Sequence, residues 1–155
     1  MKKTNNSEEL IEKVFKIFSE KIPFNKVLGL KLESVENQHP KISFLMRDDL
    51  VGNFIHGNLH GGVISSTLDV IGGLTAFIGA VKKLDGKSEQ EKIQIFSKLG
   101  TIDLRIDYLR PGKGTSFTAT GSLLRTGNKV AVTRMELYNN EDLLIAVGTG
   151  TYLVG

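Results

Sequence analysis

Apolar residues near the start of the chain recur at the spacing of an amphipathic helix. The pattern begins after Ser7 and ends at Pro23, a residue that interrupts helices. Its apolar positions fall on one face: Leu10, Ile11, Val14, Phe15, Ile17 and Phe18. We therefore expect an N-terminal helix that packs against a sheet.

The next part of the chain changes pattern several times. Two strand-like runs lie within 26–46, on either side of turn-forming residues at 36–40. A loop rich in glycine and histidine follows at 52–62 and leads into an apolar helix at about 61–81. A polar stretch then contains a short predicted helix at 88–98.

After Gly100 the periodicity becomes that of strands. Ile102, Leu104, Ile106 and Tyr108 alternate with polar residues, which predicts a half-buried strand. Turn residues separate the further strand-like segments 115–124, 130–138 and 143–154. The chain shows no internal repeat. We predict one α+β domain in which a long antiparallel sheet packs on a helix inserted after its first strands.

Composition narrows the function classes. A chain of 155 residues with 40% hydrophobic and 24% charged residues suits a single globular domain. The net charge of +3 is spread along the chain, whereas nucleic-acid binders concentrate basic residues. The absence of cysteine excludes disulfides, thiolate nucleophiles and cysteine-ligated zinc. We find no signal-peptide pattern and no stretch approaching ~20 apolar residues, and expect a cytoplasmic protein with no membrane partner.

The predicted helix at 61–81 has one face of small residues around a single acid, Asp69. The positions within about 60° of Asp69 are small: Gly62, Ser65, Ser66, Gly72, Gly73, Ala76 and Ala80. Each glycine inside a helix costs about 1 kcal/mol relative to alanine. We expect the close approach of a second backbone or of a ligand to offset that cost.

The rest of this helix is apolar, which predicts that it is buried. An unpaired carboxylate in such a place destabilises the fold. Two interpretations of Asp69 follow: it meets an arginine or backbone N–H from elsewhere in the chain, or it is a functional carboxylate held in a cleft.

The loop before this helix directs amide groups toward the helix start at Gly61. A helix start has unpaired N–H donors and partial positive charge, which suits an oxyanion or a polarised carbonyl. His56 and His60 are four residues apart and raise the alternative of a zinc site. The glycines make this segment a loop, and no third ligand with suitable spacing is found.

Geometry limits how Gly61 and Asp69 act together. Eight residues on one helix separate them by roughly 12 Å. A reacting carbonyl must lie within about 3 Å of both its oxyanion donor and its attacking group. If both groups act, Asp69 must serve a substrate held at Gly61 of a neighbouring subunit, which requires a two-fold dimer.

These residues resemble a known family. Asn53 and Gly57, then His60-Gly61-Gly62, with Asp69 nine residues after the histidine, are similar to the motif of PaaI-like (phenylacetate-pathway) hot-dog thioesterases. The resemblance continues through the segment 100–112 and covers roughly residue 25 to the end of the chain.

The resemblance implies a hot-dog fold at 26–155 after an N-terminal helical extension at 1–25. It also implies homodimers that share sites and often pair into tetramers. The implied roles are a Gly61 N–H that polarises the thioester carbonyl and a partner Asp69 that acts as general base or nucleophile. Asn53 and His60 would orient the carbonyl and shape the loop, and Thr101 would position the water.

The resemblance also implies contacts with the substrate, acyl-CoA, and no separate cofactor or metal. The turns at 108–113 and 125–130 match segments that touch coenzyme A. The implied substrate-contacting residues are Gly62, Ser66, Asp103, Tyr108, Arg110, Pro111, Gly112, Lys113, Arg125, Thr126, Gly127, Asn128 and Lys129. The four basic residues among them suit the phosphates of coenzyme A.

The chain departs from the family pattern in two places. The spacing from Asn53 to His60 is one residue longer than in some relatives, and the stretch 84–99 is longer than a minimal hot-dog domain needs. We expect that stretch to form a lid or part of a subunit interface.

Three hypotheses follow for the function. The first is hydrolysis of an acyl-CoA thioester by water that Asp69 activates. The second is dehydration or hydration of an acyl thioester by His60 and Asp69. The third is an acyl-CoA-binding domain without catalysis, although a carboxylate beside an apolar chain argues against it. The sequence does not predict the acyl chain.

Overall fold

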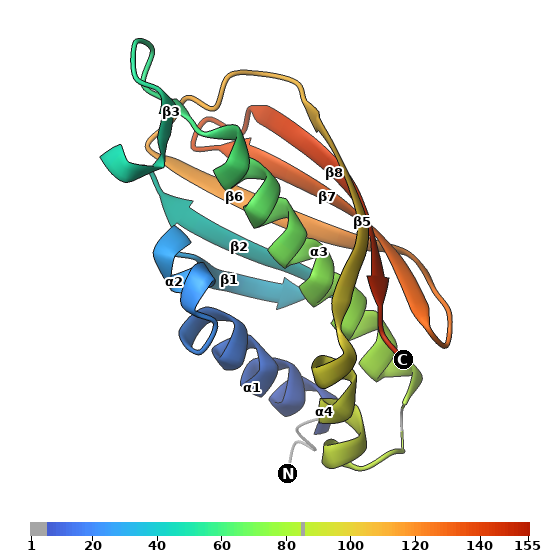
Figure 1. Cartoon of the computed structure of the whole chain (residues 1–155). Coiled ribbons are helices and arrows are strands. Elements are labelled where there is room, and N and C mark those ends of the chain that lie inside the picture. Colours follow the sequence, from blue (N-terminus) through green and yellow to red (C-terminus); the bar gives the residue numbers. More distant parts are fainter. Residues whose placement is uncertain (1–5, 85) are drawn as a thin grey trace.

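A six-stranded antiparallel sheet and one long helix, α3, form the two layers of the fold (Figure 1). The computed structural model describes residues 6–84 and 86–155. The strand order is β1-β2-β6-β7-β8-β5, and α3 packs against five of these strands. The predicted α+β hot-dog architecture, with the sheet wrapped around a central helix, is confirmed.

The elements follow the predicted order. The helices are α1 (Asn6–Glu20), α2 (Pro23–Leu28), η1 (Asp48–Leu50), α3 (Gly61–Lys83) and α4 (Glu89–Lys98). The strands are β1 (Lys31–Glu36), β2 (His39–Leu45), β3 (Val51–Asn53), β4 (Asn58–Leu59), β5 (Gly100–Tyr108), β6 (Ser116–Thr126), β7 (Val130–Asn139) and β8 (Leu144–Leu153). The loop predicted at 52–62 thus contains the small β3–β4 pair.

The N-terminal helix is confirmed, but the strand predicted to start at residue 26 is wrong. Pro23 does not simply end a helix, because it also begins α2, where a proline without an N–H is well tolerated. Gly29 ends α2 with a φ of 71°, and β1 begins only at Lys31. α1 packs against α2, α3 and β1 rather than across the sheet. Whether residues 1–25 form a separate extension stays a prediction.

Helix α3 forms the core of the domain. Leu68, Ile71 and Phe77 are fully buried. By length and composition alone α3 could cross a membrane, since it has 23 residues and a window of mean hydropathy 1.6. However, 72% of that window is buried within the structure. The apolar length of α3 is therefore explained by its place inside the wrapped sheet.

Two glycines of α3, Gly72 and Gly79, accommodate side chains of the chain's own sheet. A Cβ on Gly72 would lie 2.2 Å from the Tyr152 hydroxyl oxygen, and one on Gly79 would lie 2.6 Å from Leu123 Cδ2. Gly73 is different, because its nearest neighbour would be 3.6 Å away on the Tyr152 ring. Gly72 is thus covered by β8 and Gly79 by β6.

The two edges of the sheet are β1 and β5. The half-buried face predicted for β5 is only partly correct: Leu104 and Ile106 pack on the core, while Ile102 is 57% and Tyr108 54% exposed. An exposed edge strand with apolar side chains can pair with another strand. This edge runs alongside α3 (Figure 1).

The helix predicted at 88–98 is confirmed as α4. Ser88 accepts a hydrogen bond from the Glu91 N–H, and the Glu91 carboxylate accepts one from the Ser88 N–H. This reciprocal cap fixes the start of the helix. α4 packs against α3 just before the chain enters β5.

Candidate active site

The first functional cluster lies at the start of α3, and we call Gly61, His60 and Tyr108 the helix-start site. The His60 ring accepts a hydrogen bond from the Gly62 N–H at Nδ1, at 2.8 Å. Within the described residues the Gly61 N–H donates to no protein atom. His60 therefore caps one amide of the helix start and leaves its neighbour free.

A pocket of about 580 Å³ opens at the helix-start site. Seven of the predicted site residues line it: Asn53, His60, Gly61, Tyr108, Arg110, Pro111 and Gly112. The Tyr108 hydroxyl donates to the Gly61 carbonyl oxygen at 3.1 Å. A Cβ on Gly112 would lie 2.7 Å from Leu59 Cβ, so glycine lets the loop after β5 close one side of this pocket.

Asn53 is in this pocket, but its oxygen is already used. Asn53 Oδ1 accepts hydrogen bonds from the N–H groups of Ile55 at 3.1 Å and His56 at 3.3 Å. This local turn shapes the exposed β3–β4 connection. If Asn53 orients a substrate carbonyl, as the resemblance implies, its side-chain amide nitrogen must donate the hydrogen bond. This role stays a prediction.

The second cluster surrounds the acid, and we call Asp69, Thr101 and Tyr152 the carboxylate site. Thr101 Oγ1 donates to Asp69 Oδ1 at 2.9 Å, and the Tyr152 hydroxyl lies 3.2 Å from the same oxygen. Asp69 is half-buried, although most of the helix around it is buried. Among the described residues it forms no ion pair, and neither an arginine nor a backbone N–H meets it.

Both of these hydroxyl groups lie at Oδ1. Across the parts of the chain that the structure describes, Oδ2 accepts no hydrogen bond. The carboxylate is therefore held in orientation on one side and is available on the other. A water or a substrate atom is the natural partner for Oδ2.

Tyr152 is the site residue that the sequence analysis missed. Its side chain is 1% exposed, and its hydroxyl also lies 3.1 Å from the Asp69 backbone oxygen. Burial, together with the nearby Asp69 carboxylate, raises the pKa of the Tyr152 phenol far above its usual value. The Tyr152 hydroxyl therefore stays protonated and can donate a hydrogen bond to Asp69. A tyrosine on the inward face of β8, opposite the glycines of α3, was the available signal.

The remaining residues near α3 and β5 have other surroundings. The Ser66 hydroxyl donates to the Gly62 carbonyl oxygen at 2.7 Å, within the helix. Asp103 is exposed on β5, next to an irregularity in the β5–β8 pairing. Lys113 is exposed beside the helix-start pocket but does not line it. The predicted substrate contacts of these residues stay predictions.

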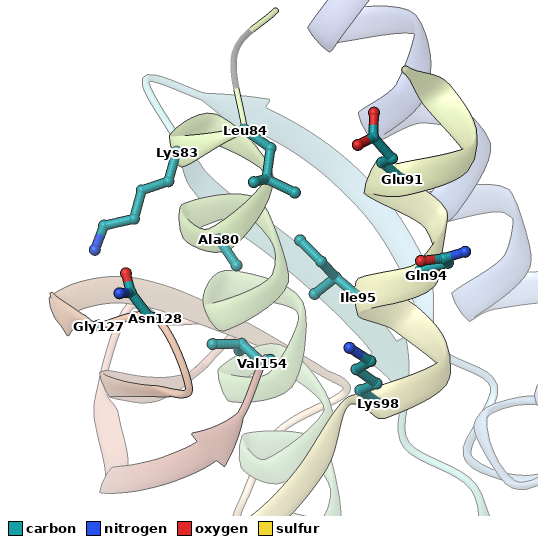
Figure 2. A pocket seen from close by; sticks show the side chains of 11 residues that line it. Ala80, Lys83, Leu84, Glu91, Gln94, Ile95, Lys98, Gly127, Asn128 and Val154 are labelled. Atoms are coloured by element: carbon teal, nitrogen blue, oxygen red, sulfur yellow. The ribbon is translucent and has the colours of Figure 1, made fainter. Parts of the chain in front are cut away.

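The turn at 125–130 lies at the opposite end of α3 from Gly61. Gly127 and Asn128 line a pocket of about 300 Å³ with Lys83 and Lys98 (Figure 2). Figure 2 shows Lys98 on α4, on the other side of this pocket from Gly127 and Asn128. Within one chain, the structure thus separates this turn from the basic residues at 110–113. The pocket lies about three helical turns from Asp69, roughly 16 Å along the axis, so we place the chemistry elsewhere.

The two histidines considered for zinc have different surroundings in the structure. Among the described residues no group of three or more His, Cys, Asp or Glu side chains gathers. His56 lies in the exposed β3–β4 connection, and the His60 ring accepts the bond from Gly62. The hydrogen bonds of the two clusters on α3 are donated by the Gly62 amide and by the hydroxyl groups of Thr101, Tyr108 and Tyr152.

Comparison with known proteins relates the chain to a protein family. A family model described as "Thioesterase superfamily" matches residues 56–146. The "Medium/long-chain acyl-CoA thioesterase YigI" of Escherichia coli (strain K12) is 48% identical over 149 residues, which cover 96% of this chain and 96% of that protein.

Solved structures agree in fold. A crystal structure from Shewanella oneidensis, of a protein related to the thioesterase superfamily, is 46% identical with a TM-score of 0.93, covering 96% of this chain and 97% of that one. The Escherichia coli PaaI protein of the phenylacetic acid degradation operon is 17% identical with a TM-score of 0.76, covering 97% of this chain and 96% of that one. At that identity PaaI supports the fold alone.

Proposed function

The chain belongs to the thioesterase superfamily, and we propose that it hydrolyses the thioester bond of medium- or long-chain acyl-CoA. The chain length follows the name of the YigI relative. The observation that carries the proposal is a pair of unused groups on α3: the Gly61 N–H and Asp69 Oδ2.

In the proposed reaction, Asp69 is the general base or the nucleophile. As a base, it takes a proton through Oδ2 from a water that attacks the carbonyl carbon of the thioester. The Gly61 N–H donates to the oxyanion that forms, and the helix dipole adds to this stabilisation. The C–S bond then breaks, and coenzyme A leaves as the thiol once its sulfur takes up a proton. Thr101 and Tyr152 hold Asp69 in orientation.

The two groups belong to different subunits in this proposal, because roughly 12 Å of helix separates them within one chain. The edge strand β5 supports a specific dimer. Its first part holds Thr101, bonded to Asp69, and its last residue is Tyr108, bonded to Gly61. Antiparallel pairing of two β5 strands about their midpoint would place the carboxylate site of one subunit beside the helix-start site of the other.

An assay of thiol release tests the reaction. The protein should release free coenzyme A from acyl-CoA of medium or long chain, and a thiol reagent has no background here because the chain contains no cysteine. Lack of turnover over a panel from short to long and aromatic acyl-CoA would overturn the proposal. Binding without turnover would favour the non-catalytic alternative.

Cross-linking tests the dimer. The Arg105 side chain is 77% exposed near the middle of β5, and Lys31 is exposed on the opposite edge strand, β1. With a short thiol-specific cross-linker, Arg105→Cys should give covalent dimers and Lys31→Cys should not. Cross-linking at Lys31 alone, or at neither position, would contradict pairing through β5.

We also propose a cytoplasmic homodimer, itself paired into a tetramer, that needs no cofactor beyond the coenzyme A of its substrate. Nucleic acid and membrane are not among the proposed partners. The dehydratase alternative requires a histidine that exchanges a proton with the substrate, and His60 Nδ1 is already bonded to the helix start. If the protein converts a 3-hydroxyacyl thioester into an enoyl product, that result would support the dehydratase alternative.

A further inference from the structure

We propose that the apolar pocket beside Asp69 receives the acyl chain, and that α1, α2 and α4 set the chain length the enzyme accepts. This inference rests on the proposed hydrolysis and deepens it. The pocket has a volume of about 270 Å³ and includes the three residues of the carboxylate site. Its apolar walls are Phe18, Ile22, Val70, Phe96 and Leu99.

The chemistry of the reaction places the acyl chain at this pocket. The attacked carbonyl carbon must lie within about 3 Å of the Asp69 carboxylate or of the water it activates. The first carbons of the acyl chain therefore lie against the surface around Asp69. None of the residues that line this pocket is a lysine or arginine. An apolar chain suits it, and a phosphate does not.

The helix-start pocket has a mixed lining. Arg110, two asparagines and His60 line it together with apolar residues such as Leu59, Ile64 and Leu109. Arginine and amide groups suit the polar and charged parts of coenzyme A. In the composite site, the substrate would therefore extend from the helix-start pocket of one subunit to the apolar pocket of the other.

The outer wall of the apolar pocket is formed by three helices that lie outside the sheet–α3 core: α1, α2 and α4. Phe18 of α1 packs edge-to-face on Phe96 of α4, with ring centroids 5.3 Å apart. Asn25 of α2 is 2% exposed and donates to the Phe18 carbonyl oxygen at 2.7 Å. Figure 1 shows α1 and α4 beside the same part of α3. The long stretch before β5 thus contributes Phe96 and Leu99 to this wall.

Phe18, Asn25 and Val70 line this pocket and also line a much smaller cavity of about 10 Å³, whose other walls are mostly apolar. The end of a long acyl chain would meet Phe18 and Val70. The side chains of α1 and α4, rather than the reacting groups, would then decide how many methylenes fit.

Gly73 offers a variant that narrows the pocket without disturbing the fold. A Cβ there would lie 3.6 Å from the Tyr152 ring and 3.9 Å from Leu99 Cδ2, which are ordinary contacts. Gly73 lines the pocket, so Gly73→Ala adds a methyl group inside it. Phe96→Ala is the opposite change, because it removes a large part of the outer wall.

The test is kcat/KM for a series of saturated acyl-CoA from four to sixteen carbons. Gly73→Ala should lower the ratio of long-chain to short-chain kcat/KM by about tenfold or more. Phe96→Ala should move the optimum to longer chains. The matched control is Ile93→Ala on the outer face of α4, where Ile93 is 42% exposed and lines none of these pockets. It should leave the profile unchanged.

The outcomes separate this inference from the proposed function. If the unmodified protein hydrolyses the series and Gly73→Ala and Phe96→Ala change every chain length by the same factor, the acyl chain binds elsewhere and only this inference fails. If the unmodified protein hydrolyses none of the series, the proposed function itself fails. Melting temperatures of the three variants show whether Phe96→Ala remains folded, and Gly73→Ala alone suffices if it does not.

Discussion

The helix-start site and the carboxylate site lie on the same helix but offer a substrate different groups. The helix-start site provides a backbone N–H in a pocket of polar and apolar side chains, where His60 accepts from the Gly62 N–H and the Tyr108 hydroxyl donates to the Gly61 carbonyl oxygen. The carboxylate site provides a side chain held by two hydroxyls beside an apolar pocket.

This difference shows why neither site is complete alone. An oxyanion donor without an attacking group only binds a carbonyl, and a carboxylate without a donor faces a poorly polarised one. The rigid spacing along α3 keeps the two sites of one chain apart. A dimer would bring the helix-start site of one subunit beside the carboxylate site of the other. Substitutions can change either of the two sites separately.

The largest effect is expected at the carboxylate. Asp69→Asn keeps the size of the side chain and an oxygen that can accept from Thr101 and Tyr152, but removes the base. We expect thioester turnover to fall by about 10²–10⁴-fold, with an unchanged circular dichroism spectrum. Turnover equal to that of the unmodified protein would remove Asp69 from the mechanism.

At the helix-start site, Gly61→Pro removes the N–H and adds the proline ring. Proline is favoured at the first position of a helix, and His60, with φ of −65° and ψ of 135°, already has the backbone that precedes proline. We expect kcat to fall by about 10²–10³-fold.

Gly61→Ala is the control for this change, because it adds a Cβ but keeps the N–H. That Cβ would lie 3.4 Å from the Tyr108 ring. Alanine should therefore retain much more activity than proline. Equal losses in the two variants would indicate a steric effect and argue against a role for the amide.

The adjacent glycines of α3 should respond in opposite ways. A Cβ on Gly72 would collide with the Tyr152 hydroxyl, so Gly72→Ala should cost about 1–3 kcal/mol of unfolding free energy and displace a hydroxyl from Asp69. Gly73→Ala has room and should stabilise by about 0.5–1 kcal/mol. Denaturant unfolding measures both, and equal shifts would contradict the packing described for Tyr152.

The smallest effect is expected for the cap. His60→Ala removes the acceptor of the Gly62 N–H and should cost about 1 kcal/mol of stability. His60→Asn restores a capping oxygen and should recover most of it. If asparagine recovers stability but not activity, His60 also has a role toward the substrate.

Local pattern was sufficient for most of the fold. Strand-forming residues between turn signals predicted β6 to β8, and the apolar length around Asp69 predicted α3. The prediction failed at residues 26–28, which belong to the short helix α2 and not to a strand. A segment this short carries little periodicity, so tertiary packing determines its structure. It also failed for Ile102, because the alternation of a strand does not reveal whether it lies at an edge.

The site was predicted in part for similar reasons. Gly61, His60 and Asp69 belong to one continuous segment, so spacing alone relates them. Tyr152 comes from a strand 83 residues away in the chain, and its contact with Asp69 depends on the β8 register. The apolar pocket was likewise unpredictable, since α1, α2 and α4 meet only in the folded structure.

A mixture of two inactive variants tests the shared site most directly. Asp69→Asn lacks the base and Gly61→Pro lacks the donor. When both chains are co-expressed, half of the dimers are mixed, and each mixed dimer has one site with both groups intact. The account predicts recovery of roughly a quarter of the unmodified activity. If both groups acted within one chain, no active site could form, and a mixture as inactive as its components would contradict the account.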